Sequence, residues 1–347
     1  ELRVLGVSDL DVDCEVVRGG RLTERRGVAT PGRTPSQSFP DQRAKDALEF
    51  AAKQEADFVA LSTITTVKNI EVAREILGQH GLKDPYVISK IERPEALDNF
   101  DSILDASDGI MVARGDMGVE VPLSDVPVIQ KDIIARCNAK GKPVITATQM
   151  LESMLKSPVP TRAEVTDVAN AIFDGTDAIM LSGETSIGDY PTEAVAVMVE
   201  VAIKAEEALP YDRMLMEKRG QTEPHTDDAI AYNACLTAHQ LNASVIVAFT
   251  ESGSTAGRVS KYRPRSRILA LTPSERGERR LTLRWGVMPV TIPSITSVDD
   301  FFDQCEHMAI EVCELQKDSI VVLVAGLPIG VPGGTNLLRV LSISEQE

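Results

Sequence analysis

The spacing of hydrophobic and polar residues divides the chain into segments of different secondary structure. Between Asp46 and about Asp189, stretches with the spacing of an amphipathic helix alternate with short runs that are almost continuously apolar. Such runs are typical of strands buried on both faces of a parallel sheet, and the amphipathic stretches are typical of the helices that cover it. We therefore expect strands at 56–62, 85–92, 108–116, 142–150 and 176–185, and helices near 67–80, 93–107, 125–139, 162–174 and 191–208.

Different patterns flank these five β–α units. Residues 1 to about 40 hold short β-prone runs and turn signals such as Arg18-Gly19-Gly20, which predict β-rich structure. A polar linker is expected from Leu209 to Pro224. After it, a second α/β alternation predicts a smaller doubly wound domain. Its expected elements are a helix at 226–241 and strands near 243–249, 267–271, 287–292, 319–325 and 337–342, with helices between them.

Polar residues that can do chemistry stand at the carboxyl end of every strand in the first group. They are Ser62, Lys90, Glu92, Arg114, Asp116, Thr148, Ser182 and Glu184. The carboxyl ends of parallel strands meet on one face, where α/β enzymes place their active sites, so we expect a functional site there. The competing explanation is that polar residues only mark where each strand leaves the core.

Three of these positions favour a site for a divalent cation and an anionic oxygen. Lys90 and Glu92 are two residues apart and therefore project from the same face of a strand. Asp116 adds a second carboxylate at the next strand end, and Mg²⁺ is usually held by one or two carboxylates with its other positions left for substrate. A strand-end ion pair between Lys90 and Glu92 would explain these two residues without a metal.

Backbone and hydroxyl groups surround these carboxylates. Gly115 and Gly118 let the backbone of residues 113–116 approach a ligand, and a helix that begins there would point free N–H groups at an anion. Thr146 and Thr148 are expected to share one face, where a hydroxyl could bind a carboxylate or pass a proton through water; a helix N-cap is the alternative. The set suits a reaction that develops negative charge on an enolate or phosphoryl oxygen beside Mg²⁺.

Two loops of the second domain are candidate anion sites. Residues 250–255 join a strand to a helix, and hydroxyls with a glycine at such a turn can bind phosphate. Residues 331–336 form a second glycine loop that is equally well explained as a plain turn. The basic run at 261–265 is more simply a solvated or interface patch than a nucleic-acid site.

Charge and cysteine content narrow the classes of function. The chain has 36 Lys and Arg against 52 Asp and Glu, and this net charge of −16 argues against a nucleic-acid binder. No apolar run is as long as a membrane span. The five cysteines include no Cys-x-x-Cys pair, which favours a reducing, cytoplasmic compartment. Cys305 and His307 alone are too few ligands for a metal site.

Longer segments closely resemble one known family, pyruvate kinase. They are VISKIERPEAL, DGIMVARGDMGVE, GKPVITATQMLESM, the stretch from Ser157 to Val195, and SKYRPRSRILALT. The resemblance implies transfer of the phosphoryl group of phosphoenolpyruvate to ADP, giving ATP and pyruvate. It implies a (β/α)8 TIM barrel, an inserted β-rich lid domain and a C-terminal α/β domain. Residues 1–38 would then be a remnant of the lid, 39–212 the last five units of the barrel, and 213–347 the regulatory α/β domain.

The resemblance also implies roles for residues of the barrel. Lys90 would stabilise the transferring phosphoryl group and the enolate oxygen, while Glu92 and Asp116 would ligate Mg²⁺ or Mn²⁺. Thr148 would contact the substrate carboxylate and help to deliver a proton to enolpyruvate. The same carboxylate would be held by the backbone of Ala113, Arg114, Gly115 and Asp116.

Further partners follow from the same resemblance. It implies a homotetramer, a K⁺ ion, and a sugar-phosphate or nucleotide effector in the second domain. The effector would be bound by Thr250, Ser252, Gly253, Ser254 and Thr255.

The chain departs from the family pattern near its start. It begins at Glu1, and the family's Asn-x-Ser-His and Asp-Thr-Lys-Gly segments, which supply the K⁺ site and contacts to the phosphoryl group, do not occur in it. Residues 62–65 read Ser-Thr-Ile-Thr where the family usually carries an arginine. We therefore expect an N-terminally incomplete pyruvate kinase with impaired turnover, because one lost electrostatic contact costs roughly 2.7–4 kcal/mol of transition-state stabilisation.

Two other functions remain open at this point. One is a non-catalytic module that binds sugar phosphates through residues 250–255. The other is a Mg²⁺-dependent lyase that cleaves C–C bonds through a pyruvate enolate, since barrels with Glu and Asp on Mg²⁺ include such enzymes. The segment GDYPTEAV at 188–195 and the appended α/β domain favour the kinase over the lyase.

Overall fold

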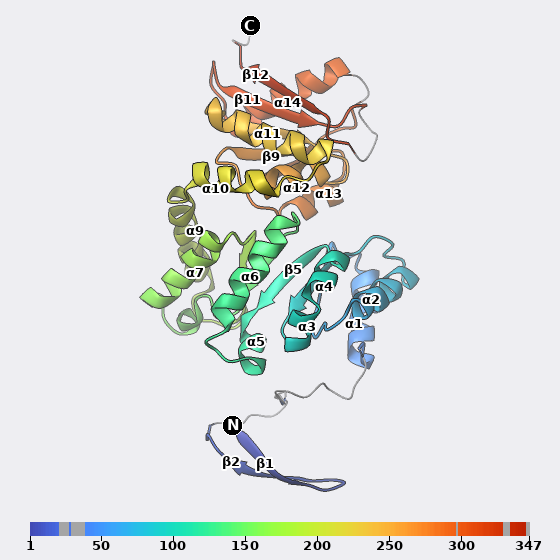
Figure 1. Ribbon diagram of the computed structural model, residues 1–347, viewed down its shortest axis with the longest axis vertical. Coiled ribbons are helices and arrows are strands. Elements are labelled where there is room, and N and C mark those ends of the chain that lie inside the picture. Colours follow the sequence, from blue (N-terminus) through green and yellow to red (C-terminus); the bar gives the residue numbers. More distant parts are fainter. Residues whose placement is uncertain (21–27, 29–38, 296–297, 329–333, 345–347) are drawn as a thin grey trace. The chain divides into compact units, whose positions relative to one another are not determined.

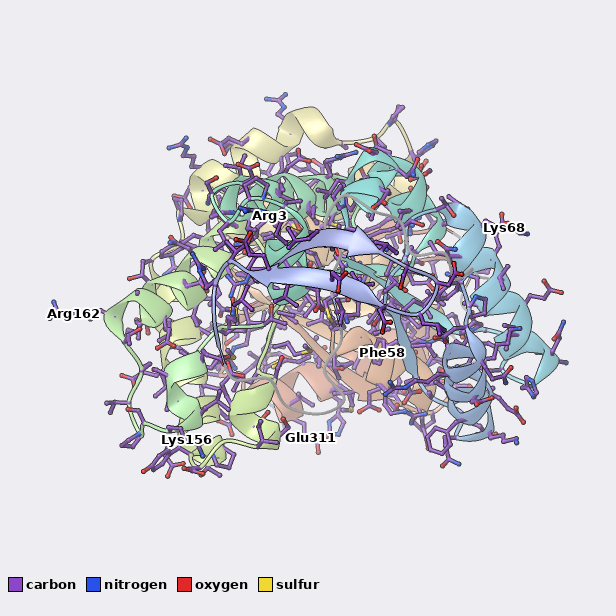
Figure 2. The ribbon with its side chains drawn as sticks, turned by 90° about the horizontal axis from the view of Figure 1, so that it is seen from below. Arg3, Phe58, Lys68, Lys156, Arg162 and Glu311 are labelled. Atoms are coloured by element: carbon purple, nitrogen blue, oxygen red, sulfur yellow. The ribbon has the colours of Figure 1, made fainter. Side chains whose placement is uncertain are left out.

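The computed structural model describes residues 1–20, 28, 39–295, 298–328 and 334–344. It divides into two compact units, Glu1–Thr34 and Pro35–Glu347. In the first unit, β1 (Leu2–Val7) and β2 (Val12–Val16) form an antiparallel hairpin whose apolar side chains are mostly exposed. Arg3, labelled in Figure 2, lies on this hairpin and pairs with Glu15 at 2.8 Å. The rest of the predicted lid remnant, 21–27 and 29–38, lies outside the described residues.

Five parallel strands form the first sheet of the second unit. They lie in the order in which they occur in the chain, and each pairs in parallel with the next. Consecutive strands become neighbours because a helix crosses back between each pair, which is the arrangement of a (β/α) barrel. The strands are β3 (Phe58–Leu61), β4 (Tyr86–Ile91), β5 (Gly109–Ala113), β6 (Val144–Ala147) and β7 (Ala178–Met180).

Helices cover one face of this sheet, as Figure 1 shows for α4 and α6 in front of β5. The helix predicted at 93–107 is broken at Asn99, whose side-chain amide donates to the carbonyls of Thr65 and Glu95. The helices are α1 (Gln42–Lys53), α2 (Val67–Gln79), α3 (Pro94–Asp98), α4 (Phe100–Ala106), α5 (Arg114–Glu120), α6 (Val126–Ala139), α7 (Arg162–Asp174), α8 (Gly183–Ser186) and α9 (Pro191–Glu207), with a 3₁₀ turn at Glu152–Leu155.

The two faces of the sheet have different surroundings. Val87, Ile110 and Val144 point to the helices and belong to the largest cluster of buried apolar residues. Ile88, Met111 and Ile145, one residue further along, lie on the opposite face in a separate cluster that includes Leu283 of the C-terminal domain. Burial on both sides explains why these strands are apolar at nearly every position.

The C-terminal domain has a sheet between two layers of helices. Its strand order is β10-β9-β8-β11-β12, and β12 is antiparallel to β11 while the other pairs are parallel. Alternate residues of the strands pack on α11 and α12 or on α14, so the doubly wound prediction is confirmed. The elements are α11 (Thr226–Gln240), β8 (Val245–Phe249), α12 (Ser254–Lys261), β9 (Arg267–Thr272), α13 (Glu275–Leu281), β10 (Val287–Thr291), α14 (Val298–Cys313), β11 (Ile320–Ala325) and β12 (Leu337–Ser342).

The segment between the two sheets, predicted as a polar linker from Leu209 to Pro224, is largely helical. It contains α10 (Tyr211–Lys218) and a 3₁₀ turn at Arg219–Gln221. Leu215 of α10 is buried in the core that α11 and α12 share. Tyr211 and Met214 pack against a second buried cluster. A few apolar residues among charged neighbours are enough to fix a short helix by packing, although they leave a weak periodic signal in the sequence.

Ion pairs join the amino ends of the barrel strands to the C-terminal domain. Asp177, directly before β7, receives two hydrogen bonds from Arg263, at 2.8 and 3.0 Å, and both side chains are almost fully buried. Arg263 also donates to the side chain of Asn138 and the carbonyl of Gly175. Arginines of α13 make similar contacts before β3 and β4, in the pairs Arg279–Asp57 and Arg280–Asp84. In the described residues, no helix has the length and apolar content that a bilayer crossing demands.

The buried pair predicts a large loss of stability in Asp177→Ala, by about 3–5 kcal/mol, because Arg263 would keep an uncompensated charge. The exposed pair Lys204–Glu207 offers a matched control, and Glu207→Ala should cost less than about 1 kcal/mol. The double variant Asp177→Ala/Arg263→Met should recover part of the loss. Urea unfolding of the four proteins measures these differences, and equal costs for the two single variants would contradict the prediction.

Candidate functional site

The carboxyl ends of β3 and β4 bring a cation and a carboxylate together. The ammonium Nζ of Lys90 lies 2.6 Å from Oε1 of Glu92 and donates to the hydroxyl of Ser62 at 3.0 Å. The other carboxylate oxygen of Glu92 accepts the backbone N–H of Thr63 at 2.8 Å. Lys90 and Glu92 thus project together, as two residues of one strand face should. Lys90 reaches solvent with 22% of its side chain exposed, whereas Glu92 keeps 7%.

The carboxylates of this edge fit a hard divalent cation. Oε1 of Glu92 is buried and accepts no hydrogen bond of normal geometry from a described residue. Asp116 lies in the first turn of α5 and is exposed. Ile91 pairs with Val112, so Glu92 and Asp116 follow neighbouring strands. In the part of the chain that the structure describes, no three His, Cys, Asp or Glu residues group as metal ligands. Two carboxylates are a sufficient protein share for Mg²⁺, which keeps its other positions for water and substrate oxygens.

The loop after β6 contacts the start of α5. The hydroxyl of Thr148 accepts the N–H of Gly115 at 2.7 Å and donates to the carbonyl of Ala147 at 2.6 Å. A Cβ atom on Gly115 would lie 3.3 Å from that hydroxyl oxygen, so a side chain there would press on Thr148. The glycine therefore allows close approach of the two segments. Its N–H donates to the hydroxyl of Thr148, and a ligand oxygen could take the place of that hydroxyl as acceptor.

Thr146 does not take part in this contact, and the prediction that it shares a face with Thr148 is wrong. Its hydroxyl donates to that of Thr176 at 3.0 Å, and both side chains are buried. The alternation of a strand stops at Ala147, because Thr148 has a positive φ of 70°. A change of backbone conformation at the strand end removes the period of two on which the prediction rested.

Left-handed backbone occurs at two of the strand ends. Thr63 has φ 56° after β3, and Thr148 and Gln149 have φ 70° and 55° after β6. This conformation is rare for residues other than glycine and especially for branched threonine, and such strain collects at functional sites. The sequence gives no signal for it, since no glycine or asparagine stands at these positions.

Two other predicted residues, Arg114 and Glu184, form hydrogen bonds that stabilise the loops at the strand ends. The side chain of Arg114 turns to Asp167, at 2.7 Å, and to the carbonyl of Thr148, at 2.8 Å. Glu184 is 1% exposed and accepts the N–H groups of Leu151 and Ser182. Both side chains tie one strand-end loop to a neighbouring element, so Arg114 offers only its backbone to a ligand.

The loop at 250–255 lies between β8 and α12. Gly253 has φ 87° and precedes α12, to whose first N–H groups it offers no side-chain cap. Thr250 is buried, and its hydroxyl has no hydrogen-bond partner in the described residues. The hydroxyl of Thr255 meets that of Thr335 at 2.9 Å. The second glycine loop of the sequence thus reaches the first one, although its residues 331–333 lie outside the described part.

Comparisons with known proteins match both halves of the chain. A family model of the pyruvate kinase barrel domain matches residues 1–195, and one of the pyruvate kinase alpha/beta domain matches 228–341. The pyruvate kinase of Clostridium acetobutylicum is 45% identical over 98% of this chain and 72% of its own length. That of Clostridium perfringens is 43% identical, over 99% and 73%. For the pyruvate kinase of Staphylococcus haemolyticus the figures are 43%, 99% and 59%.

The strained loop after β6 predicts opposite effects of glycine at two glutamines. Gln149→Gly should stabilise the protein, by up to about 1 kcal/mol, because its side chain is exposed and glycine adopts positive φ without strain. Gln79→Gly, at an exposed position of α2 with ordinary helical backbone, should destabilise it by about 1 kcal/mol. Thermal unfolding measures both shifts. A loss of stability in both variants would show that the loop is not strained.

Proposed function

The chain belongs to the pyruvate kinase family, and we propose that it transfers the phosphoryl group of phosphoenolpyruvate to ADP, giving pyruvate and ATP. The observation that carries the proposal is the contact between Lys90 and Glu92 at the carboxyl end of β4, one strand from Asp116. A fixed ammonium group beside a buried carboxylate can meet both the negative charge of a phosphoryl oxygen and a divalent cation.

Lys90 is the group that acts on the transferring atoms. In the reaction the bond from phosphorus to the enol oxygen breaks, and a bond from phosphorus to a terminal oxygen of ADP forms. Negative charge develops on the phosphoryl oxygens and on the enolate that is left behind. The ammonium of Lys90 is held by Ser62 and Glu92 on the rim, so it can stabilise this charge without reorganisation.

Glu92 and Asp116 would hold Mg²⁺ or Mn²⁺ through their carboxylates, as the oxygen-only chemistry of these two side chains favours. Such an ion, when bound, supplies Lewis-acid stabilisation of the developing negative charge. The N–H of Thr63 keeps the second oxygen of Glu92 in place and thereby orients the carboxylate.

The contact between Gly115 and Thr148 is suited to the substrate carboxylate. An arriving carboxylate can accept the N–H of Gly115 in place of the threonine hydroxyl. The hydroxyl can donate to the same ligand once its hydrogen turns away from the carbonyl of Ala147. From this position the hydroxyl of Thr148 can also pass a proton, through water, to the methylene carbon of the enolate, which completes pyruvate. Arg114 stabilises the loop that carries Thr148 but does not reach the reacting atoms.

Finer properties of the family are part of the proposal. Residues 250–255 are proposed to bind a phosphorylated effector, supported by the start of α12, which has no side-chain cap, and by the hydroxyl of Thr250, which has no partner in the described residues. Self-association is supported by α9, where Val195, Val199 and Ile203 are about half exposed at helical spacing on one face. A K⁺ requirement and a cytoplasmic location stay predictions.

The kinase is favoured over the two alternatives because the family matches extend over the barrel and the α/β domain together. A C–C lyase would have no need of the second domain, and a module that only binds an effector would have no need of the Lys90–Glu92 contact. No observation on the described residues favours either alternative.

We expect Lys90→Ala to lower the rate of pyruvate formation by about 10²–10³-fold, because a preorganised charge is lost from the transition state. The assay contains phosphoenolpyruvate, ADP, Mg²⁺ and K⁺. Lys68→Ala is the control, since this lysine extends from α2 into solvent with 74% of its side chain exposed (Figure 2). Equal rates in the two variants would contradict the assignment of Lys90. The rate of the unaltered chain tests the expectation of impaired turnover.

Metal binding tests the carboxylates without requiring turnover. Mn²⁺ titrated in the presence of oxalate, a planar mimic of the pyruvate enolate, should bind at least about tenfold more weakly to Glu92→Gln and to Asp116→Asn, because each loses an anionic ligand. Glu71→Gln is the control, as Glu71 is exposed on α2. Electron paramagnetic resonance of free Mn²⁺ gives the affinities. Unchanged affinity in both site variants would place the metal elsewhere.

A further inference from the structure

A small cavity lies where the barrel sheet meets the C-terminal domain. Its volume is about 10 Å³, which is the room of a single water-sized particle. The charged side chains that line it are those of Lys142, Lys261, Arg263, Arg284 and Asp177. Four cations thus face one carboxylate, in a chain whose net charge is −16.

Two of the lining cations have carboxylate partners. Arg263 forms the buried pair with Asp177, and Nζ of Lys261 lies 3.2 Å from both carboxylate oxygens of Asp228. These pairs account for Asp177, the one carboxylate that lines the cavity, and neither pair includes Lys142 or Arg284.

Lys142 and Arg284 form no close ion pair within the described residues, although the carboxylates of Asp108 and Asp105 attract the ammonium of Lys142. Neither forms an ion pair with any residue that the structure describes. Their N–H groups donate instead to backbone carbonyls, which are those of Leu104, Asp105 and Ser107 for Lys142 and that of Gly141 for Arg284. A carbonyl satisfies a donor but does not neutralise its charge.

Lys218 adds a further cation next to the cavity. Its ammonium donates to the carbonyl of Lys261, a lining residue. Burial, together with repulsion from Arg263 and Lys261, lowers the pKa of Lys218 to about 7, against the opposing attraction of Asp177 and Cys235. Burial is the largest cause of this shift, and the neighbouring cations add to it.

Arg263 also has a donor to spare. Its side chain is 3% exposed, and its Nε–H is buried without an acceptor among the described residues. A buried donor of a charged group without a partner is costly, and structures that contain one usually place a water molecule or an ion against it.

We propose that this cavity binds one small monatomic anion of chloride size between the barrel and the C-terminal domain. Such an anion accepts the spare N–H of Arg263 and offsets the positive charge of Arg284, which forms no ion pair with a described residue. A water molecule could accept the hydrogen bond but would leave the charges in place. An oxyanion such as phosphate is too large for the volume. The proposal concerns the junction and does not depend on the proposed catalytic activity.

Thermal unfolding of the full chain tests the site. Chloride replaces methanesulfonate, a larger monovalent anion, stepwise at constant ionic strength. The unfolding midpoint should rise by a few degrees and level off as the site fills, because a ligand that binds only the folded state stabilises it. Arg284→Gln should lose most of this rise. Lys204→Gln should keep it, since it removes one charge from an exposed helical position away from the cavity.

Bromide locates the ion directly. Crystals of the unaltered chain soaked in bromide should show an anomalous peak in the cavity. Three results would overturn the proposal: no chloride-specific rise in the unaltered chain, an equal rise in Arg284→Gln, or water alone in the cavity after the bromide soak. Where Arg284→Gln does not fold, the bromide map of the unaltered chain decides, with a peak in favour of the anion and its absence against.

Discussion

The five barrel strands all run in the same direction, and this constraint determines which residues stand at each end of the sheet. Because every strand runs the same way, all carboxyl ends meet at one edge and all amino ends at the opposite one. The first edge holds Lys90, Glu92 and Thr148, whose polar groups are partly unsatisfied or replaceable. At the second edge, Asp57 and Asp177 are held by arginines of the other domain. Chemistry and stability are thereby separated, as is usual in barrels of this kind.

This constraint explains why much of the site is predictable from the sequence. Once the apolar runs are recognised as parallel strands, the residues that follow each run must lie near one another, whatever the details of the helices. The contact of Lys90 with Glu92 follows from their spacing within one strand. The elements themselves are predictable for a related reason, since strands buried on both faces are almost continuously apolar and stand out from the amphipathic helices between them.

The features that the sequence could not predict are set by the surrounding structure and not by local sequence preferences. The positive φ of Thr63 and Thr148 is imposed by the surrounding loops, and threonine carries no preference that would reveal it. Thr148 does not share the face of Thr146, which contacts Thr176, because the strand stops at Ala147. Helix α10 is fixed by the burial of Leu215, which is a property of the assembled core and not of the surrounding polar sequence.

The junction between the barrel sheet and the α/β domain could not be predicted from the sequence either. Arg263 and Asp177 are 86 residues apart, so only the folded chain reveals that the basic run at 261–265 is a buried interface. This run begins at Lys261, the last residue of α12, a helix that starts beside the loop 250–255 and spans about 12 Å. The loop and the residues that hold the amino ends of the barrel strands therefore lie at opposite ends of one short helix.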